Sequence, residues 1–195
     1  MKKLESSLLN MVLVLTLVAV IMGGLLALVN HVTEGPIAEV NKQKLDNGIK
    51  SVMCADELNV ADPVEVKQMV DGKELTYLVY EAKDKDGNAL GAAVESTTMG
   101  FGGDLKVLVG FDPDGKVLGY TLLAHTETPG LGAKADQWFQ KGQKGDIIGK
   151  DPQEPLTVSK DGGQVDAITA STITSRAFLK AVNNAYKAYK ATPAE

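Results

Sequence analysis

Hydroxyl side chains crowd one short stretch of the sequence, residues 166–175, which reads DAITASTITS. Half of this stretch is serine or threonine, and an apolar pattern with helical spacing follows it. The start of a helix offers unpaired N–H groups at the positive end of its dipole, which suits a phosphate or another anion. Simple capping of the helix by one hydroxyl is the alternative, and both stay open here. The hydroxyl residues are Thr169, Ser171, Thr172, Thr174 and Ser175.

Two glycine-containing loops are the other candidates for a binding site. The loop HTETPGLG, residues 125–132, has two glycines around a leucine, which would let the backbone approach a flat ligand. The stretch GFGG, residues 100–103, is a second glycine-rich loop. An ordinary surface loop with Pro-Gly turn chemistry is the alternative for residues 125–132. The candidate residues are Gly100, Phe101, Gly102, Gly103, His125, Glu127, Thr128, Pro129, Gly130, Leu131 and Gly132.

Composition excludes several classes of site. The chain has 195 residues and a formal net charge of −5, which argues against nucleic-acid binding. Cys54 is the single cysteine, so neither an intrachain disulfide nor a cysteine-based metal or iron–sulfur site can form within the chain. A hydrolase would have to combine Ser171 or Ser175 with His125, but the chain has no Gly-x-Ser-x-Gly motif. We therefore expect no catalytic residue and no metal.

An apolar run near the amino terminus predicts a membrane anchor. Leu8–Val29 contains no charged residue, and about 20 apolar residues suffice to cross a bilayer as a helix. A cleaved signal peptide is the alternative, but its apolar region is usually shorter. Lys2 and Lys3 precede the run, while Glu34 and Glu39 follow it. Because basic flanks stay on the cytoplasmic side, we predict a cytoplasmic amino terminus and an extracytoplasmic remainder.

The rest of the chain predicts an α+β domain with an antiparallel sheet. Gly35-Pro36 predicts a break, after which a stalk helix runs from Pro36 to about Met53. We assign residues 1–30 to the anchor, 31–56 to the stalk and linker, and 57–195 to the outer domain. The expected strands are Leu75–Ala82, Ala89–Glu95, Lys106–Phe111, Val117–Ala124, Leu156–Ser159 and Val165–Ile168, and the expected helices are Ala135–Lys141 and Ile173–Lys190.

The two loops, the hydroxyl-rich stretch and their order behind one amino-terminal span resemble the G subunit of the Rnf (Rsx) electron transport complex. The resemblance covers essentially the whole chain and extends more distantly to the C subunit of the sodium-pumping NADH:quinone reductase. The family joins FMN through its phosphate to a threonine in the pattern Asp-x-x-(Ser/Thr)-Gly-Ala-(Thr/Ser)-x-Thr. Asp166 matches its aspartate, Thr169 its first hydroxyl and Thr172 its modified threonine.

Two residues depart from that pattern. Ala170 replaces the usual glycine and Ser171 the usual alanine. Both are small, so the tight turn can form, but Ser171 adds a competing hydroxyl beside Thr172, and Thr174 is a further candidate.

The resemblance implies a fold, a cofactor and partners. It implies one transmembrane helix followed by an antiparallel-sheet FMN-binding domain with flanking helices. It also implies an electron-transfer subunit of a membrane-bound, ion-translocating ferredoxin:NAD oxidoreductase, matured by a flavin transferase that uses FAD and recognises Asp166. Other membrane and peripheral subunits of the complex are the implied partners. The alternative is an anchored, noncatalytic domain that binds a phosphate-containing ligand noncovalently.

Overall fold

The computed structural model describes residues 7–55, 57–70 and 72–192. The chain divides into two compact units, Met1–Lys44 and Leu45–Glu195. Lys2 and Lys3, on which the predicted orientation depends, lie outside the described residues. The predicted boundaries at residues 30 and 56 stay predictions.

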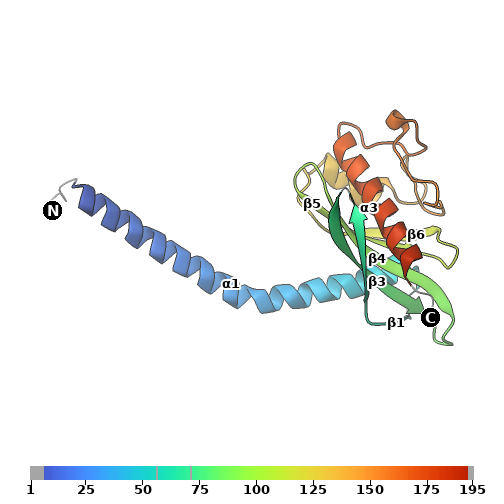
Figure 1. Ribbon diagram of the computed structural model, residues 1–195, viewed down its shortest axis with the longest axis horizontal. Helices are drawn as coiled ribbons and strands as arrows, with labels where there is room; N and C mark the ends of the chain where they lie inside the picture. The colour runs from blue at the N-terminus through green and yellow to red at the C-terminus, as the bar shows by residue number, and fades with distance from the viewer. Residues whose placement is uncertain (1–6, 56, 71, 193–195) are drawn as a thin grey trace. The chain divides into compact units, whose positions relative to one another are not determined.

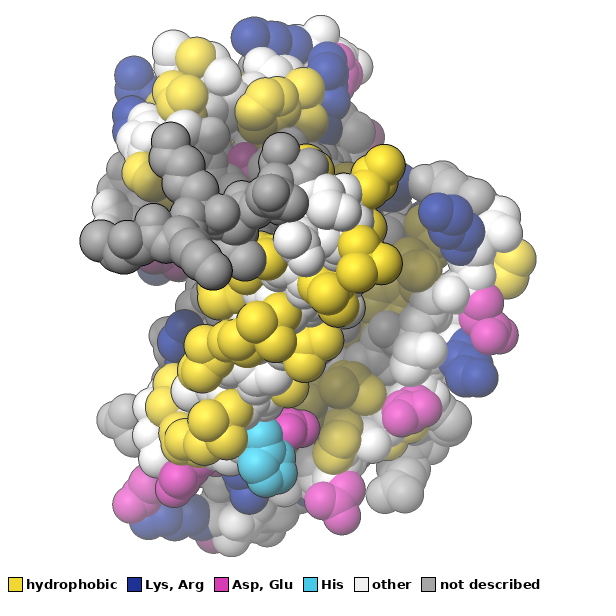
Figure 2. Space-filling view, turned by 90° about the vertical axis from the view of Figure 1, so that its left-hand side faces the viewer, with side chains coloured by type: hydrophobic (Ala, Val, Ile, Leu, Met, Phe, Trp, Pro, Cys, Tyr) yellow, Lys and Arg dark blue, Asp and Glu magenta, His cyan; other side chains and the backbone are white. Residues whose placement is uncertain are grey.

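The first long element is one helix, α1 (Leu8–Val52). Its apolar part is long enough to cross a membrane, and none of that part is buried within the chain. A signal sequence near an amino terminus would meet the same criteria. Figure 2 shows hydrophobic side chains gathered along this helix. A helix that is apolar all round and unburied needs a nonaqueous environment, so α1 has the properties expected of the predicted anchor.

The predicted break at Gly35-Pro36 is wrong. Pro36 lies inside α1, which continues on both sides of it. An interior proline removes one N–H donor and its ring clashes with the carbonyl four residues earlier, which can kink a helix without ending it, because the fixed φ of proline is a helical one.

A six-stranded antiparallel sheet forms the centre of the second unit, in the order β1-β3-β4-β5-β6. β2 also pairs with β3 and continues the edge that β1 begins, with Val60 opposite Ala82 and Val64 opposite Val79. Four of the strands extend the predicted ones by a few residues. The strands are β1 (Asn59–Val60), β2 (Val64–Val70), β3 (Lys73–Lys83), β4 (Ala89–Met99), β5 (Asp104–Phe111) and β6 (Val117–His125).

The two faces of the sheet bury two separate cores, because side chains alternate between faces along a strand. On one face, α3 (Thr172–Ala191) packs across the sheet, with Phe178 stacked on Phe139 at 4.2 Å between ring centroids (Figure 1). On the other face, Ile49 and Val52 from the last turns of α1 pack against the sheet. The predicted α+β architecture is confirmed, with the helix that ends at Val52 serving as a lid on the second face.

Five elements differ from the sequence prediction. The expected strands at 156–159 and 165–168 form only one bridge, between Val158 and Val165, with a 3₁₀ turn η2 (Ser159–Asp161) beside it. The helix predicted over Ala135–Lys141 is a 3₁₀ turn η1 (Gly132–Lys134) followed by α2 (Ala135–Trp138). β1 and β2 were not predicted.

The entry into α3 uses an unusual backbone conformation. Ala170 has φ of +62°, in the left-handed region that favours glycine. This residue stands where the family pattern has glycine, so the turn itself gives the reason for that preference.

Ala170→Gly is therefore expected to stabilise the protein. The strain energy that glycine relieves at this φ exceeds the free-energy cost of the conformational entropy that glycine adds to the unfolded chain. We therefore expect the free energy of unfolding to rise by about 0.5 to 1 kcal/mol. Urea unfolding of the detergent-solubilised chain measures it. Ala61→Gly, at an exposed loop residue outside the left-handed region, is the control and should be destabilising. Equal effects of the two substitutions would contradict the assigned strain.

Candidate functional site

The three stretches singled out in the sequence meet at one cavity of about 370 Å³. The loop after β4, the loop after β6 and the start of α3 each contribute to its wall. Sequence positions separated by about seventy residues thus face a common space. The lining residues are Phe101, Glu127, Thr128, Leu131, Gly132, Ala170, Ser171, Thr172, Ile173 and Thr174.

The carboxylate of Glu127 connects all three stretches. Its Oε1 accepts hydrogen bonds from the backbone N–H of Phe101 at 2.7 Å and of Gly102 at 3.3 Å. Its Oε2 accepts one from Thr174 Oγ1 at 2.7 Å. The side chain is buried, with 6% of the residue exposed. Hydrogen bonds to a carboxylate are stronger than those to a neutral acceptor, so Glu127 fixes the two loops on the start of α3.

Two glycines make room for this carboxylate. A Cβ on Gly132 would collide with Glu127 Oε2 and Thr174 Oγ1, and a Cβ on Gly100 would collide with Glu127 Oε1. Gly132 also lines the cavity, so its close approach to side chains of the protein does not test the predicted contact with a flat ligand, which stays a prediction.

Exposed apolar side chains line the same cavity. Phe101 is 68% exposed, Ile173 54% and Leu131 42%, and they come from three different segments. Exposed apolar groups gathered around a cavity indicate a ligand or partner surface. Their arrangement suits a flat, largely apolar ring.

The five hydroxyl side chains are in different environments. Ser175 is fully buried, and its Oγ donates to Ser171 O and accepts from Ile168 N–H. Thr174 is buried and donates to Glu127. Thr169 is exposed and does not line the cavity. Two of the five are thus committed to contacts within the protein.

Thr172 and Ser171 remain as cavity hydroxyls at the first turn of α3. Thr172 is half-buried, and its Oγ1 accepts a hydrogen bond from Lys160 Nζ at 3.1 Å. Ser171 is the N-cap residue, but its side chain makes no capping hydrogen bond. The N–H groups of the first turn are therefore not satisfied by that hydroxyl, as an anion site requires.

The turn η2 contacts the hydroxyl-rich stretch. Ser159 Oγ donates to Asp166 Oδ1 at 3.1 Å. Arg176 donates to both carboxylate oxygens of Asp161, at 2.7 and 2.6 Å. These hydrogen bonds hold the pKa of Asp161 below its usual value, so the pair persists at a lower pH than an isolated carboxylate would allow. The positive charge of Arg176 is thus paired with the carboxylate of Asp161.

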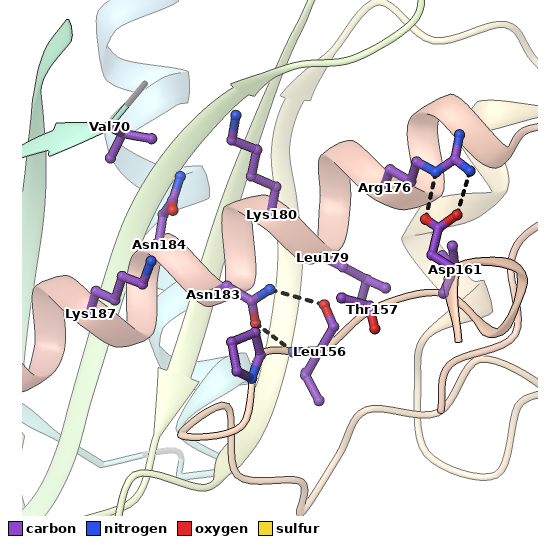
Figure 3. A pocket seen from close by; sticks show the side chains of 12 residues that line it. Val70, Leu156, Thr157, Asp161, Arg176, Leu179, Lys180, Asn183, Asn184 and Lys187 are labelled. Atoms are coloured by element: carbon purple, nitrogen blue, oxygen red, sulfur yellow. Dashed lines mark hydrogen bonds and ion pairs between the residues drawn. The ribbon is translucent and has the colours of Figure 1, made fainter. Parts of the chain in front are cut away.

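A second cavity, of about 290 Å³, lies beside this ion pair (Figure 3). Asn183 crosses it to bind the backbone of Leu156, accepting from its N–H and donating to its C=O at 2.9 Å each. Thr172 does not line this cavity. The two hydrogen bonds of Asn183 attach the segment before η2 to α3.

Several of the predicted site residues do not line the cavity. His125 Nδ1 accepts a hydrogen bond from Glu127 N–H at 3.3 Å. Neither hydrogen bond of Ser175 involves His125, so the arrangement of a hydrolase is not assembled there. Asp166 accepts a hydrogen bond from Trp138 Nε1 through its backbone carbonyl, at 2.8 Å. The predicted residues that do not line the cavity are Gly100, Gly102, Gly103, His125, Pro129, Gly130, Asp166, Thr169 and Ser175.

Sequence reasoning missed two residues of this region. Ile173 lines the cavity, and its place between two threonines in the hydroxyl-rich stretch was the available signal. Lys160 contacts Thr172 from a turn twelve residues earlier. Only the tertiary fold brings it there, and no sequence pattern marked it.

Comparison with known proteins identifies both parts of the chain. The model of the FMN-binding domain family matches residues 100–187. The model of the RnfG N-terminal region matches residues 1–52. The first match spans all three stretches that form the cavity.

Several curated relatives are named as the G subunit of an ion-translocating oxidoreductase complex. The protein from Shewanella baltica (strain OS223) is 35% identical, with 84% of this chain and 85% of the relative covered. The protein from Aliivibrio fischeri (strain ATCC 700601 / ES114) is 34% identical, with 91% and 88% covered. The protein from Cereibacter sphaeroides (strain ATCC 17029 / ATH 2.4.9) is 33% identical, with 88% and 79% covered.

The apolar helix α1 and these relatives together support a membrane protein. The cavity lies within the matched FMN-binding domain. The chain therefore belongs to the family of G subunits of ion-translocating oxidoreductase complexes.

Proposed function

We propose that this chain carries FMN joined by a phosphoester to Thr172 and passes electrons within an ion-translocating complex. The observation that carries the proposal is the position of Thr172. It is a cavity hydroxyl at the start of α3, next to a lysine ammonium, within the FMN-binding domain. Thr174 and Ser175 are less suited because their hydroxyls are buried and already hydrogen-bonded.

The residues around the cavity fit both ends of FMN. The first turn of α3 would hold the phosphate with its N–H groups. Phe101, Leu131 and Ile173 would contact the ring system with their exposed apolar side chains. Bound flavin supplies the capacity to accept and release one or two electrons, and the protein's task is to orient it and tune its potential. Glu127 performs part of that task by fixing the loops that carry these contacts.

The covalent bond serves a flavoprotein domain outside the cytoplasm, where a dissociated cofactor cannot be replaced. We propose that the anchor is uncleaved, with its amino terminus in the cytoplasm and the flavin domain on the extracytoplasmic side. A flavin transferase then installs FMN from FAD and recognises Asp166. The extents 1–30, 31–56 and 57–195 complete this proposed organisation.

The partners follow from the family. The relatives are named as subunits of ion-translocating oxidoreductase complexes. We propose that this chain assembles with the other membrane and peripheral subunits of an Rnf-type complex, which exchanges electrons between ferredoxin and NAD and moves sodium ions or protons. Substrate chemistry then belongs to the partners.

Thr172→Ala is expected to abolish covalent flavin. The protein is produced with its flavin transferase and separated by denaturing electrophoresis, and flavin fluorescence of the band is measured. Wild type should fluoresce and its intact mass should exceed that of the chain by FMN less one water. Loss of the hydroxyl removes the oxygen that forms the ester, so the variant should be dark.

Ser171→Ala is the matched control, because it restores the alanine of the family pattern and should keep full fluorescence. A bright Thr172→Ala band would move the attachment to another hydroxyl. A wild-type band that is colourless, from protein that binds FMN only before denaturation, would support the noncovalent alternative and contradict the ester.

Glu127→Ala is expected to lower the free energy of unfolding by about 3 kcal/mol, because it leaves three hydrogen bonds of a buried carboxylate unmade. Glu127→Gln should cost about 1 kcal/mol, since its amide oxygen can accept from Phe101 while its NH₂ donates to Thr174. Urea unfolding measures both, with Glu154→Ala, at an exposed loop position, as the control. Equal losses for all three variants would contradict the role assigned to this carboxylate.

A further inference from the structure

The 3₁₀ turn η2 uses three successive side chains, two of which contact the hydroxyl-rich stretch and the third of which contacts Arg176 just after it. Ser159 binds the Asp166 carboxylate, Lys160 binds the Thr172 hydroxyl and Asp161 binds Arg176. The contacts at Asp166 and Thr172 are on the residues that match the aspartate and the modified threonine of the flavin-attachment pattern. The turn η2 therefore contacts Asp166, Thr172 and Arg176, although it lies outside the segment that contains them.

The backbone of this turn is itself fixed. The bidentate pair of Asp161 with Arg176 and the double hydrogen bond of Asn183 with Leu156 attach it to α3 at two places (Figure 3). Ser159 N–H donates to Val165 O at 2.8 Å, next to the bridge between Val158 and Val165. Lys160 thus extends toward Thr172 from an anchored position, which reduces the entropy lost when its ammonium holds a partner.

The local charges single out Lys160. Arg176, near the start of α3, is paired with both carboxylate oxygens of Asp161. Lys160 Nζ is the ammonium in contact with the hydroxyl oxygen of Thr172. A phosphodiester at that oxygen carries one negative charge, within direct reach of this ammonium.

We propose that Lys160 is the positioning residue of flavin attachment. It orients Thr172 Oγ1 and pairs with the phosphate before and after the bond forms. The inference rests on the proposed function, because it presupposes an ester at Thr172. In the transfer, Thr172 Oγ1 forms a bond to the FMN phosphorus of FAD, the pyrophosphate P–O bond breaks, AMP leaves and the hydroxyl proton is released to solvent.

The first test is the rate of flavin attachment. The full-length chain is produced without flavin in detergent and mixed with FAD, Mg²⁺ and the flavin transferase, and the gain in intact mass is followed with time. Lys160→Met should slow attachment about tenfold, as expected for loss of one charge-assisted hydrogen bond. Lys160→Arg should restore most of the rate. Lys141→Met, at an exposed position outside the cavity, makes the same charge change and should match wild type.

The second test reads the phosphate directly in protein that already carries flavin. The ³¹P chemical shift of the phosphodiester is compared between wild type, Lys160→Met and Lys160→Arg at one neutral pH. Wild type and Lys160→Arg should give similar chemical shifts, because both place a cation beside the phosphate. Lys160→Met should move the resonance, because it removes that cation and its charge-assisted hydrogen bond. A purely structural lysine would not produce this pattern.

The results of the two tests distinguish a failure of the proposed ester at Thr172 from a failure of the proposed role of Lys160. If wild type accepts no flavin with an active transferase, the ester at Thr172 and the role of Lys160 both fail. If wild type is flavinylated and Lys160→Met matches it in rate and in ³¹P chemical shift, the role of Lys160 alone is wrong. Lys160 is exposed, so the variant should unfold at the wild-type urea concentration. A slow rate with an unaltered ³¹P chemical shift would also contradict pairing with the phosphate.

Discussion

The buried carboxylate of Glu127 is the contact on which the candidate flavin site depends. It accepts hydrogen bonds from the glycine-rich loop and from α3, while its own backbone belongs to the third segment. A buried carboxylate is costly unless it is hydrogen-bonded, and here both of its oxygens are engaged. The glycines at positions 100 and 132 leave the space that this arrangement needs. The cavity is therefore a consequence of polar contacts beneath it and of apolar side chains left at its surface.

The proposed flavin site has two ends. At the start of α3, the strained Ala170, the half-buried Thr172 and the ammonium of Lys160 form the proposed phosphate end. At the other end, exposed apolar side chains form the proposed contact with the ring. Both ends rest on a sheet whose opposite face is closed by the last turns of α1. The same helix that has the properties of a membrane anchor thus contributes to the folded core of the flavin domain.

Local sequence signals predicted the elements that local physics determines. The turns at Asp84 and Asp112, where the carboxylate accepts backbone N–H groups of its own turn, each join two neighbouring strands that were predicted. The amphipathic helix α3 and its hydroxyl-rich start were likewise predictable. β2 was missed because its side chains are at most half-buried and include Glu65 and Lys67, so its pattern is weak. The roles of Glu127 and Lys160 depend on contacts across 47 and 12 residues of sequence, which no local pattern encodes.

The most direct test of the central claim is to locate the flavin on the chain. Cleavage after Lys160 and Arg176 releases residues 161–176, a peptide that contains every candidate hydroxyl of the stretch. Electron-transfer fragmentation of this peptide from wild-type protein, matured by its transferase, assigns the added mass to one residue. We expect the mass of FMN less one water on Thr172 and on no other residue. Added mass on Ser171 or Thr174, or an unmodified peptide, would contradict it.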